Sequence, residues 1–106
     1  SLTSDTKVIT QDGERVMTPE QLGKRMVMAE DINGGDTVEQ AAAIFKKILN
    51  REGSWSQNAV VLANAAMALH CTGKYKTYDD AYNAAVVSLE SGKASRGLEL
   101  LIGLQQ

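Results

Sequence analysis

The alternation of apolar and polar positions predicts a β-hairpin followed by four helices. Between about 37 and 51, apolar side chains recur every three or four residues, which is the period of an amphipathic helix. The residues on that face are Val38, Ala41, Ala42, Phe45, Ile48 and Leu49. The stretch of about 57–71 is apolar nearly all round, which is typical of a helix buried on several sides. Two further stripes predict helices over about 78–91 and 93–104.

The strands of the predicted hairpin lie within about 6–18. Asp12-Gly13 is a favoured two-residue hairpin turn, and apolar residues alternate with polar ones on either side of it. This turn would place Ile9 opposite Val16. It would also place Val8 opposite Met17. An isolated hairpin is marginal in water, so we expect this one to pack on the helices.

A short segment joins the hairpin to the first long helix. Thr18 as cap and Pro19 at the first helical position predict a single helical turn that ends at Gly23. Residues 24–33 show no clear period and are predicted to be irregular. We expect the apolar residues Met26, Met28 and Ile32 in this stretch to cover an edge of the core.

Gly34-Gly35-Asp36 opens the best-marked helix and has two interpretations. Asp36 can cap the helix, and Glu39 three residues later completes a capping-box pattern. Alternatively, the free amides at the helix start can hold a phosphate. The capping role is favoured because the Asp36 carboxylate would occupy these amides and repel an anion. No Lys-Ser/Thr pair of the P-loop kind follows.

Other helix starts and loops carry single features of interest. Ser56 is a candidate cap for the helix over 57–71, and Thr77 with Asp80 repeats the capping arrangement before the helix over 78–91. Trp55 is expected in a loop, where it either folds over a helix pair or anchors a partner. Asn64 is the one polar residue inside the most apolar helix, so it is either a hydrogen-bond node or a contact with a neighbouring domain.

The chemically reactive side chains do not form a recognisable active site. His70 and Cys71 are neighbours on a helix, so their side chains point about 100° apart, and no second His exists. Asp79 and Asp80 fall in a first helical turn, where acids interact favourably with the helix dipole. We therefore predict no catalytic, no cofactor-binding and no metal-binding residue in this chain.

Length and composition narrow the possible settings. The chain has 106 residues, 43% of them hydrophobic, which fits one domain or a piece of a larger one. The net charge is −2 without a basic stripe, so no nucleic-acid partner is expected. The longest apolar stretch, 59–69, is shorter than the roughly 20 residues that span a bilayer. The single cysteine favours a reducing, cytoplasmic location, and the missing initial Met indicates a processed chain or an excised piece.

The order and spacing of several motifs resemble the C-terminal third of anthranilate phosphoribosyltransferases. The motifs are Gly34-Gly35-Asp36 with the following 37–42, the alanine-rich 58–69, Thr72-Gly73-Lys74, and the Ser-Gly-Lys-Ala of 91–94. The residues from Ser1 to Val8 resemble the strand that follows the family's Asp-Glu segment. One departure is Gln40, where the family usually has Asn.

The resemblance implies an α+β fragment of an α/β enzyme, with residues 1–106 as a single C-terminal piece of the large domain. Enzymes of that family transfer a phosphoribosyl group from phosphoribosyl pyrophosphate to anthranilate in tryptophan biosynthesis. They use Mg²⁺ and usually act as homodimers. Their diphosphate loop, acceptor-binding residues and acidic metal pair all lie before the position of Ser1. The resemblance therefore implies a chain that is inactive alone and works with the remainder of the parent enzyme.

Two alternatives stay open at this stage. The chain can be a free-standing helical module that binds a partner protein through its apolar surface. It can also be a fragment of a related glycosyltransferase of the nucleoside phosphorylase type, although those enzymes have a larger C-terminal region. Cutting the parent enzyme at this point should expose apolar surface that normally contacts the rest of the large domain, so a homo-oligomer is expected.

Overall fold

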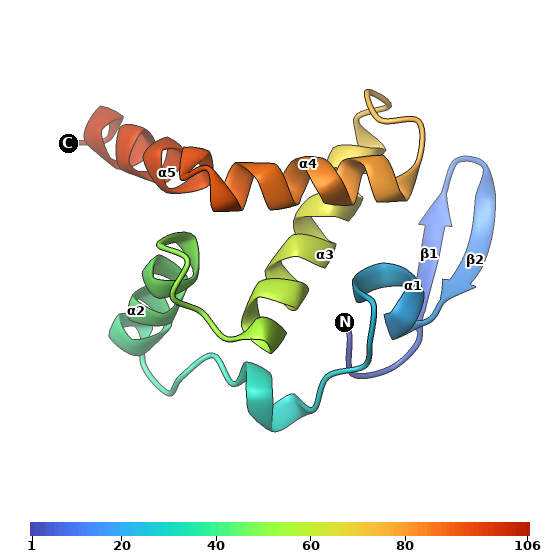
Figure 1. Cartoon of the computed structure of the whole chain (residues 1–106), viewed down its shortest axis with the longest axis horizontal. Coiled ribbons are helices and arrows are strands. Elements are labelled where there is room, and N and C mark those ends of the chain that lie inside the picture. Colours follow the sequence, from blue (N-terminus) through green and yellow to red (C-terminus); the bar gives the residue numbers. More distant parts are fainter.

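The computed structural model describes all 106 residues and places a β-hairpin at one end of an array of helices (Figure 1). The elements are β1 (Thr6–Thr10), β2 (Gly13–Met17), α1 (Pro19–Gly23), the 3₁₀ helix η1 (Ala29–Ile32), α2 (Val38–Leu49), α3 (Trp55–Cys71), α4 (Tyr78–Glu90) and α5 (Lys93–Leu104). Helices α4 and α5 follow one another along one side, while α3 crosses the middle of the molecule (Figure 1). The predicted α+β arrangement is confirmed.

The hairpin turn lies one residue earlier than the sequence predicts. Thr10 pairs with Gly13, so Gln11 and Asp12 form the turn in place of Asp12-Gly13. The Thr10 hydroxyl accepts a hydrogen bond from the Asp12 amide at 3.2 Å. Gly13 adopts φ +126°, a conformation that glycine reaches easily and that lets the second strand begin at this residue.

The earlier turn changes the register of the two strands. Ile9 lies opposite Glu14 instead of Val16, and Met17 lies opposite Thr6 instead of Val8, so both predicted pairings are wrong by two residues. Side chains alternate between the faces of a strand, so a shift of two residues leaves each side chain on its expected face. Met17 accordingly points into the core and is 5% exposed.

Helix α1 begins as predicted but uses its glycine differently. The Thr18 hydroxyl accepts a hydrogen bond from the Gln21 amide at 3.3 Å, and the Gln21 side chain accepts one from the Thr18 amide at 2.9 Å. It is Lys24, not Gly23, that takes the left-handed conformation after the helix, with φ +79°. Gly23 instead provides room, since an added Cβ would lie 2.6 Å from a methyl carbon of Leu2.

The core joins the hairpin, α1 and the first residues of the chain to α3 and α4. Its buried members are Leu2, Met17, Leu22, Val27, Ala59, Ala63, Ala66 and Tyr78. In the segment after α1, Val27 is the buried residue, while Met26 and Met28 are more than half exposed. The prediction that these two methionines cover the core edge is therefore wrong. Ile32 does pack against the core cluster, as expected.

Helix α3 is less deeply buried than its composition predicts. Its buried residues are three alanines, Ala59, Ala63 and Ala66, and most of its larger side chains are half-buried. Small side chains let two helix backbones come close, and α3 packs most extensively on α4, whose buried face includes Ala81 and Ala85. The three alanines of α3 belong to the core cluster described above, and Tyr78 is the residue of α4 that shares it.

The predicted bounds of the helices differ from the observed ones mainly at two ends. Helix α3 starts at Trp55 because Ser54, not Ser56, is its cap and forms a capping box with Gln57. Helix α2 ends at Leu49, two residues before the predicted end, and Arg51 follows with φ +66°. The bounds of α4 lie within one residue of the prediction, and those of α5 match it.

Candidate functional site

The turn before α2 is the first candidate site, and its amides are occupied by nearby side chains. The Gly35 amide donates to the Asn33 side chain at 2.9 Å, and the Asp36 amide donates to the Gln40 side chain at 2.8 Å. The Gln40 amide donates to the Thr37 hydroxyl at 3.1 Å. These bonds take up donors that a phosphate would need. The arrangement favours a structural turn over an anion site.

The same bonds correct the predicted helix cap. Thr37 caps α2 with an extended backbone, φ −131° and ψ 162°, and Gln40 replaces Glu39 as the residue that closes the turn. Gly35 adopts φ +83°, which delays the helix start until after Thr37. The predicted cap at Asp36 is therefore wrong by one residue, and the Asp36 carboxylate is left exposed.

His70 and Cys71 lie in the last turn of α3 and have different surroundings. The His70 ring stands edge-on to the Tyr78 ring at 6.4 Å between centres, and its Nδ1 atom is buried without a hydrogen-bond partner. Cys71 is exposed and unpaired. No hydrogen bond links the two side chains, so the structure does not assemble them as a base and a nucleophile.

The two neighbouring aspartates at the start of α4 are solvent-exposed and do not form part of a site. Asp79 and Asp80 are both exposed in the first turn of α4. The Thr77 hydroxyl accepts a hydrogen bond from the Asp80 amide at 3.1 Å, which confirms Thr77 as the cap. No group of three or more His, Cys, Asp or Glu side chains in the structure has an arrangement that fits a metal ion.

Trp55 and Asn64 occupy positions that the sequence did not predict. Trp55 is the first residue of α3 rather than part of a loop, and the Arg25 guanidinium lies 3.9 Å from the centre of its ring. Asn64 is exposed, and its amide donates to the carbonyl of Val60 in its own helix at 2.8 Å. The prediction that Asn64 is a buried hydrogen-bond node is therefore wrong.

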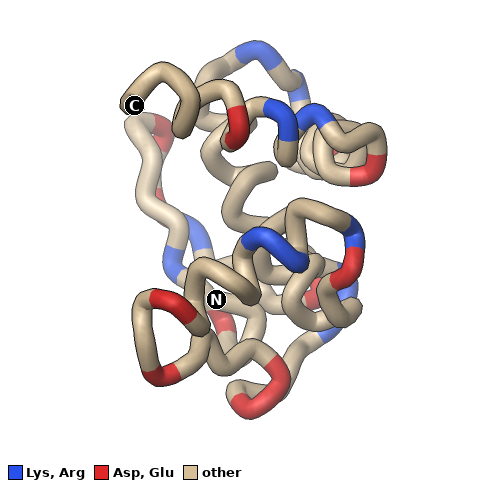
Figure 2. The backbone as a smooth tube through the Cα atoms, turned by 90° about the vertical axis from the view of Figure 1, so that its left-hand side faces the viewer, with Lys and Arg blue, Asp and Glu red and all other residues tan.

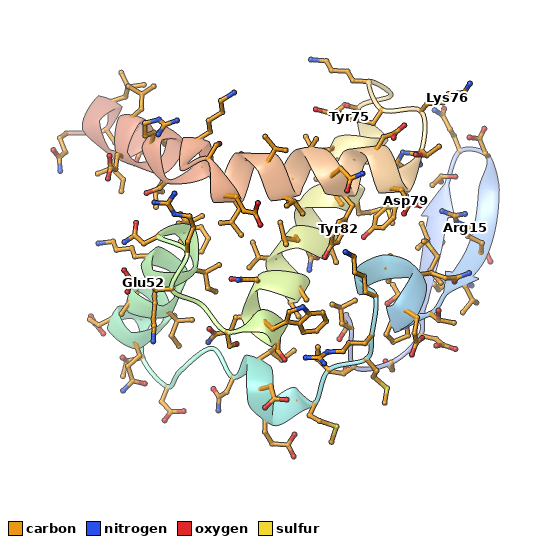
Figure 3. All side chains as sticks on the ribbon, in the orientation of Figure 1. Arg15, Glu52, Tyr75, Lys76, Asp79 and Tyr82 are labelled. Atoms are coloured by element: carbon orange, nitrogen blue, oxygen red, sulfur yellow. The ribbon has the colours of Figure 1, made fainter.

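A polar pocket that the sequence did not reveal lies where β2, α1 and the adjoining ends of α3 and α4 meet. Its volume is about 560 Å³, and its lining includes Arg15, Glu20, His70, Lys76 and Asp79. Figure 3 shows Arg15 on the hairpin and Lys76 and Asp79 beside the start of α4, on the same side of the molecule. Two basic and two acidic side chains balance one another here, so the pocket has no preference for one sign of charge.

Charge is likewise mixed over the rest of the molecule. Basic and acidic positions are interspersed along the backbone (Figure 2). The one ion pair joins Lys7 and Glu14 across the hairpin at 3.1 Å, and both side chains are more than half exposed. An exposed pair of this kind contributes at most about 1 kcal/mol. None of the helices combines the length and apolar character needed to cross a membrane.

Tyr78 is the most constrained polar side chain near the pocket. It is 8% exposed, and its hydroxyl donates to the Leu22 carbonyl at 2.5 Å, with the Ala63 carbonyl at 3.4 Å. Burial, with smaller contributions from Tyr82 and Asp79, raises the pKa of Tyr78 to about 12. The hydroxyl thus ties α4 to α1 and stays protonated, which is a structural role.

Removing this hydroxyl is expected to destabilise the chain. Tyr78→Phe should lower the free energy of unfolding by about 1–3 kcal/mol, because the Leu22 carbonyl loses its donor.

The raised pKa of Tyr78 also makes the stability depend on pH. The unfolded tyrosine has a pKa near 10 and the folded one near 12. The stability from retaining this proton is therefore complete below about pH 10 and is lost as the pH rises towards 12. Urea unfolding at about pH 8 and about pH 11 should show a steeper loss for the original chain than for Tyr78→Phe.

These observations define an α+β piece that has a connected core but no assembled catalytic group. Comparison with known protein families shows that residues 3–95 match the glycosyl transferase family, α/β domain. The chain therefore belongs to this family.

The similar proteins with a curated description are enzymes. The chain is 41% identical to the anthranilate phosphoribosyltransferase of Flavobacterium johnsoniae over 95% of its length. It is 40% identical to the enzyme of the same name from Bacteroides thetaiotaomicron over 98% of its length. The chain spans only about 30% of the length of these relatives. A search of solved structures found no significant match.

Proposed function

We propose that this chain is the C-terminal part of an anthranilate phosphoribosyltransferase. The complete enzyme would transfer a phosphoribosyl group from phosphoribosyl pyrophosphate to the amino group of anthranilate, in tryptophan biosynthesis and in the cytoplasm. The observation that supports this most is the 41% identity to the Flavobacterium johnsoniae enzyme across 95% of the chain. Family membership also weakens the alternative of a free-standing interaction module.

The part that this chain would play is structural. Its hairpin and α3–α4 pair form one core, and its candidate chemical groups remain apart or solvated. The chain's own residues do not fit a Mg²⁺ site, since no suitable cluster of carboxylates exists. Mg²⁺ and both substrates would therefore be held by the remainder of the enzyme.

A homo-oligomer is a further part of this proposal. Leu100, Leu101 and Leu104 of α5 are 68%, 53% and 77% exposed, which is a large apolar surface for the end of one helix. Light scattering of the complete enzyme measures whether two or more copies associate.

A chimeric enzyme tests the proposed function. In it, the 101 matched residues of the Flavobacterium johnsoniae enzyme are replaced by those of this chain. The chimera should form phosphoribosyl anthranilate from anthranilate and phosphoribosyl pyrophosphate with Mg²⁺, whereas the isolated 106-residue chain should form none. The unmodified relative is the positive control. A folded but inactive chimera, or an active isolated chain, would contradict the proposal.

A further inference from the structure

Helix α2 has an apolar stripe that is covered at one end only. At about 100° per residue, Val38, Ala41 and Phe45 fall on one face, and Ile48 and Leu49 continue it. Ile48 and Leu49 are 5% and 7% exposed, whereas Val38 is 80% and Phe45 45% exposed. The first two turns of α2 therefore present an uncovered apolar face.

The other side of α2 is polar, and the helix is held only near its end. Glu39, Lys46 and Lys47 lie away from the stripe. Beyond the helix, the Ser95 hydroxyl lies 3.3 Å from the side-chain oxygen of Asn50, where α2 contacts α5. A helix with a continuous apolar stripe and a charged opposite face normally buries that stripe against a neighbouring element.

The family domain supplies a neighbour of the right chemistry. Helices of an α/β domain bury their apolar stripes on the faces of a mostly parallel sheet, whose strands are rich in apolar residues. This chain contains a two-stranded antiparallel hairpin as its only sheet, at the end of the molecule away from α2 (Figure 1). The chain spans about 30% of the length of its relatives, and the proposed function places the rest of the domain in a longer polypeptide.

We propose that the exposed stripe of α2, formed by Val38, Ala41, Ala42 and Phe45, docks on an apolar sheet face of the same α/β domain, contributed by the rest of the polypeptide. This inference rests on the proposed function, because that function places the chain inside a longer enzyme. The stripe lies within the residues 3–95 that the family shares. By contrast, the exposed leucines at the end of α5 lie beyond residue 95, which makes them the better candidates for contact with a second copy.

If α2 docks in this way, a substitution on its stripe should have different effects in the isolated chain and in the chimeric enzyme. Phe45→Glu should leave the melting temperature of the isolated chain nearly unchanged, because the ring is already half exposed there. In the chimeric enzyme the same substitution should lower the melting temperature strongly, since the new carboxylate would face an apolar sheet. Ala43→Glu is the matched control, because it adds the same charge to the opposite, exposed side of α2. It should be nearly neutral in both proteins.

Hydroxyl-radical labelling of Phe45, read by mass spectrometry, tests the surface without any substitution. We expect several-fold weaker labelling of Phe45 in the chimera than in the isolated chain. Equal and strong labelling in both proteins would overturn the proposal, and equal protection in both would indicate a second copy as the occupant. Loss of catalysis with Phe45 still protected only in the chimera would overturn the proposed function and leave the docking surface standing.

Discussion

Replacing Leu2 by Ala is expected to lower the free energy of unfolding by about 2–5 kcal/mol. Leu2 is 1% exposed and is the largest fully buried side chain of the protein. It fills the space above Gly23, and its carbonyl accepts a hydrogen bond from the Val27 amide at 2.9 Å. Shortening it would leave a cavity between the start of the chain, α1 and α3. A domain of this size has a total stability of only about 5–15 kcal/mol, so the loss is large.

Urea unfolding of Leu2→Ala, followed by circular dichroism, measures this effect. Val87→Ala is the control, because it also shortens an apolar side chain, at a position that is 60% exposed. The control should change the stability by less than about 0.5 kcal/mol. Equal effects of the two substitutions would show that Leu2 does not pack in the core.

The importance of Leu2 could not be predicted from the sequence. It stands alone among polar residues and follows no helical or strand period, so pattern analysis has no signal for it. Val27 was missed because no helical or strand period distinguishes it from the neighbouring Met26 and Met28, which were expected to be buried. The long helices, in contrast, were predicted within a few residues, because each is a long segment with an apolar stripe or, in α3, a nearly continuous apolar composition.

Helix caps show where local sequence signals compete. Thr18 and Thr77 were predicted correctly, since each is the best capping residue in its immediate segment. Before α2, Asp36 and Thr37 are both good caps, and the conformation of Gly35 selects the second. Which of the two residues caps the helix depends on the conformation of the preceding loop, and tertiary structure determines that conformation.

The polar pocket and the role of Tyr78 depend on contacts between distant parts of the chain. Tyr78 and its partner Leu22 are 56 residues apart, and no motif connects them. The sequence placed Tyr78 only at the start of the helix predicted over about 78–91. The absence of a motif also explains why the resemblance to a family was more informative about function than any single candidate residue.

The buried alanines of α3 lead to the second large expected effect. Ala66 and Ala81 are each 0% exposed, and the helices that carry them pack against one another. Ala66→Leu adds three carbon atoms to a side chain that has no exposed surface within the core cluster, so it should push the neighbouring elements apart or distort side chains. We expect a loss of about 1–3 kcal/mol in the free energy of unfolding.

Ala68→Leu separates overpacking from other effects of a larger side chain. Ala68 lies on the same helix but is exposed, so the added atoms meet solvent and the helix propensity changes equally. Thermal unfolding of both variants should show a marked decrease in melting temperature for Ala66→Leu alone. Close alanine packing is what allows a chain with 5% aromatic residues to form a core at all. If Ala66→Leu were as stable as Ala68→Leu, the packing around Ala66 would have to be looser than the structure shows, and the core would need another source of stability.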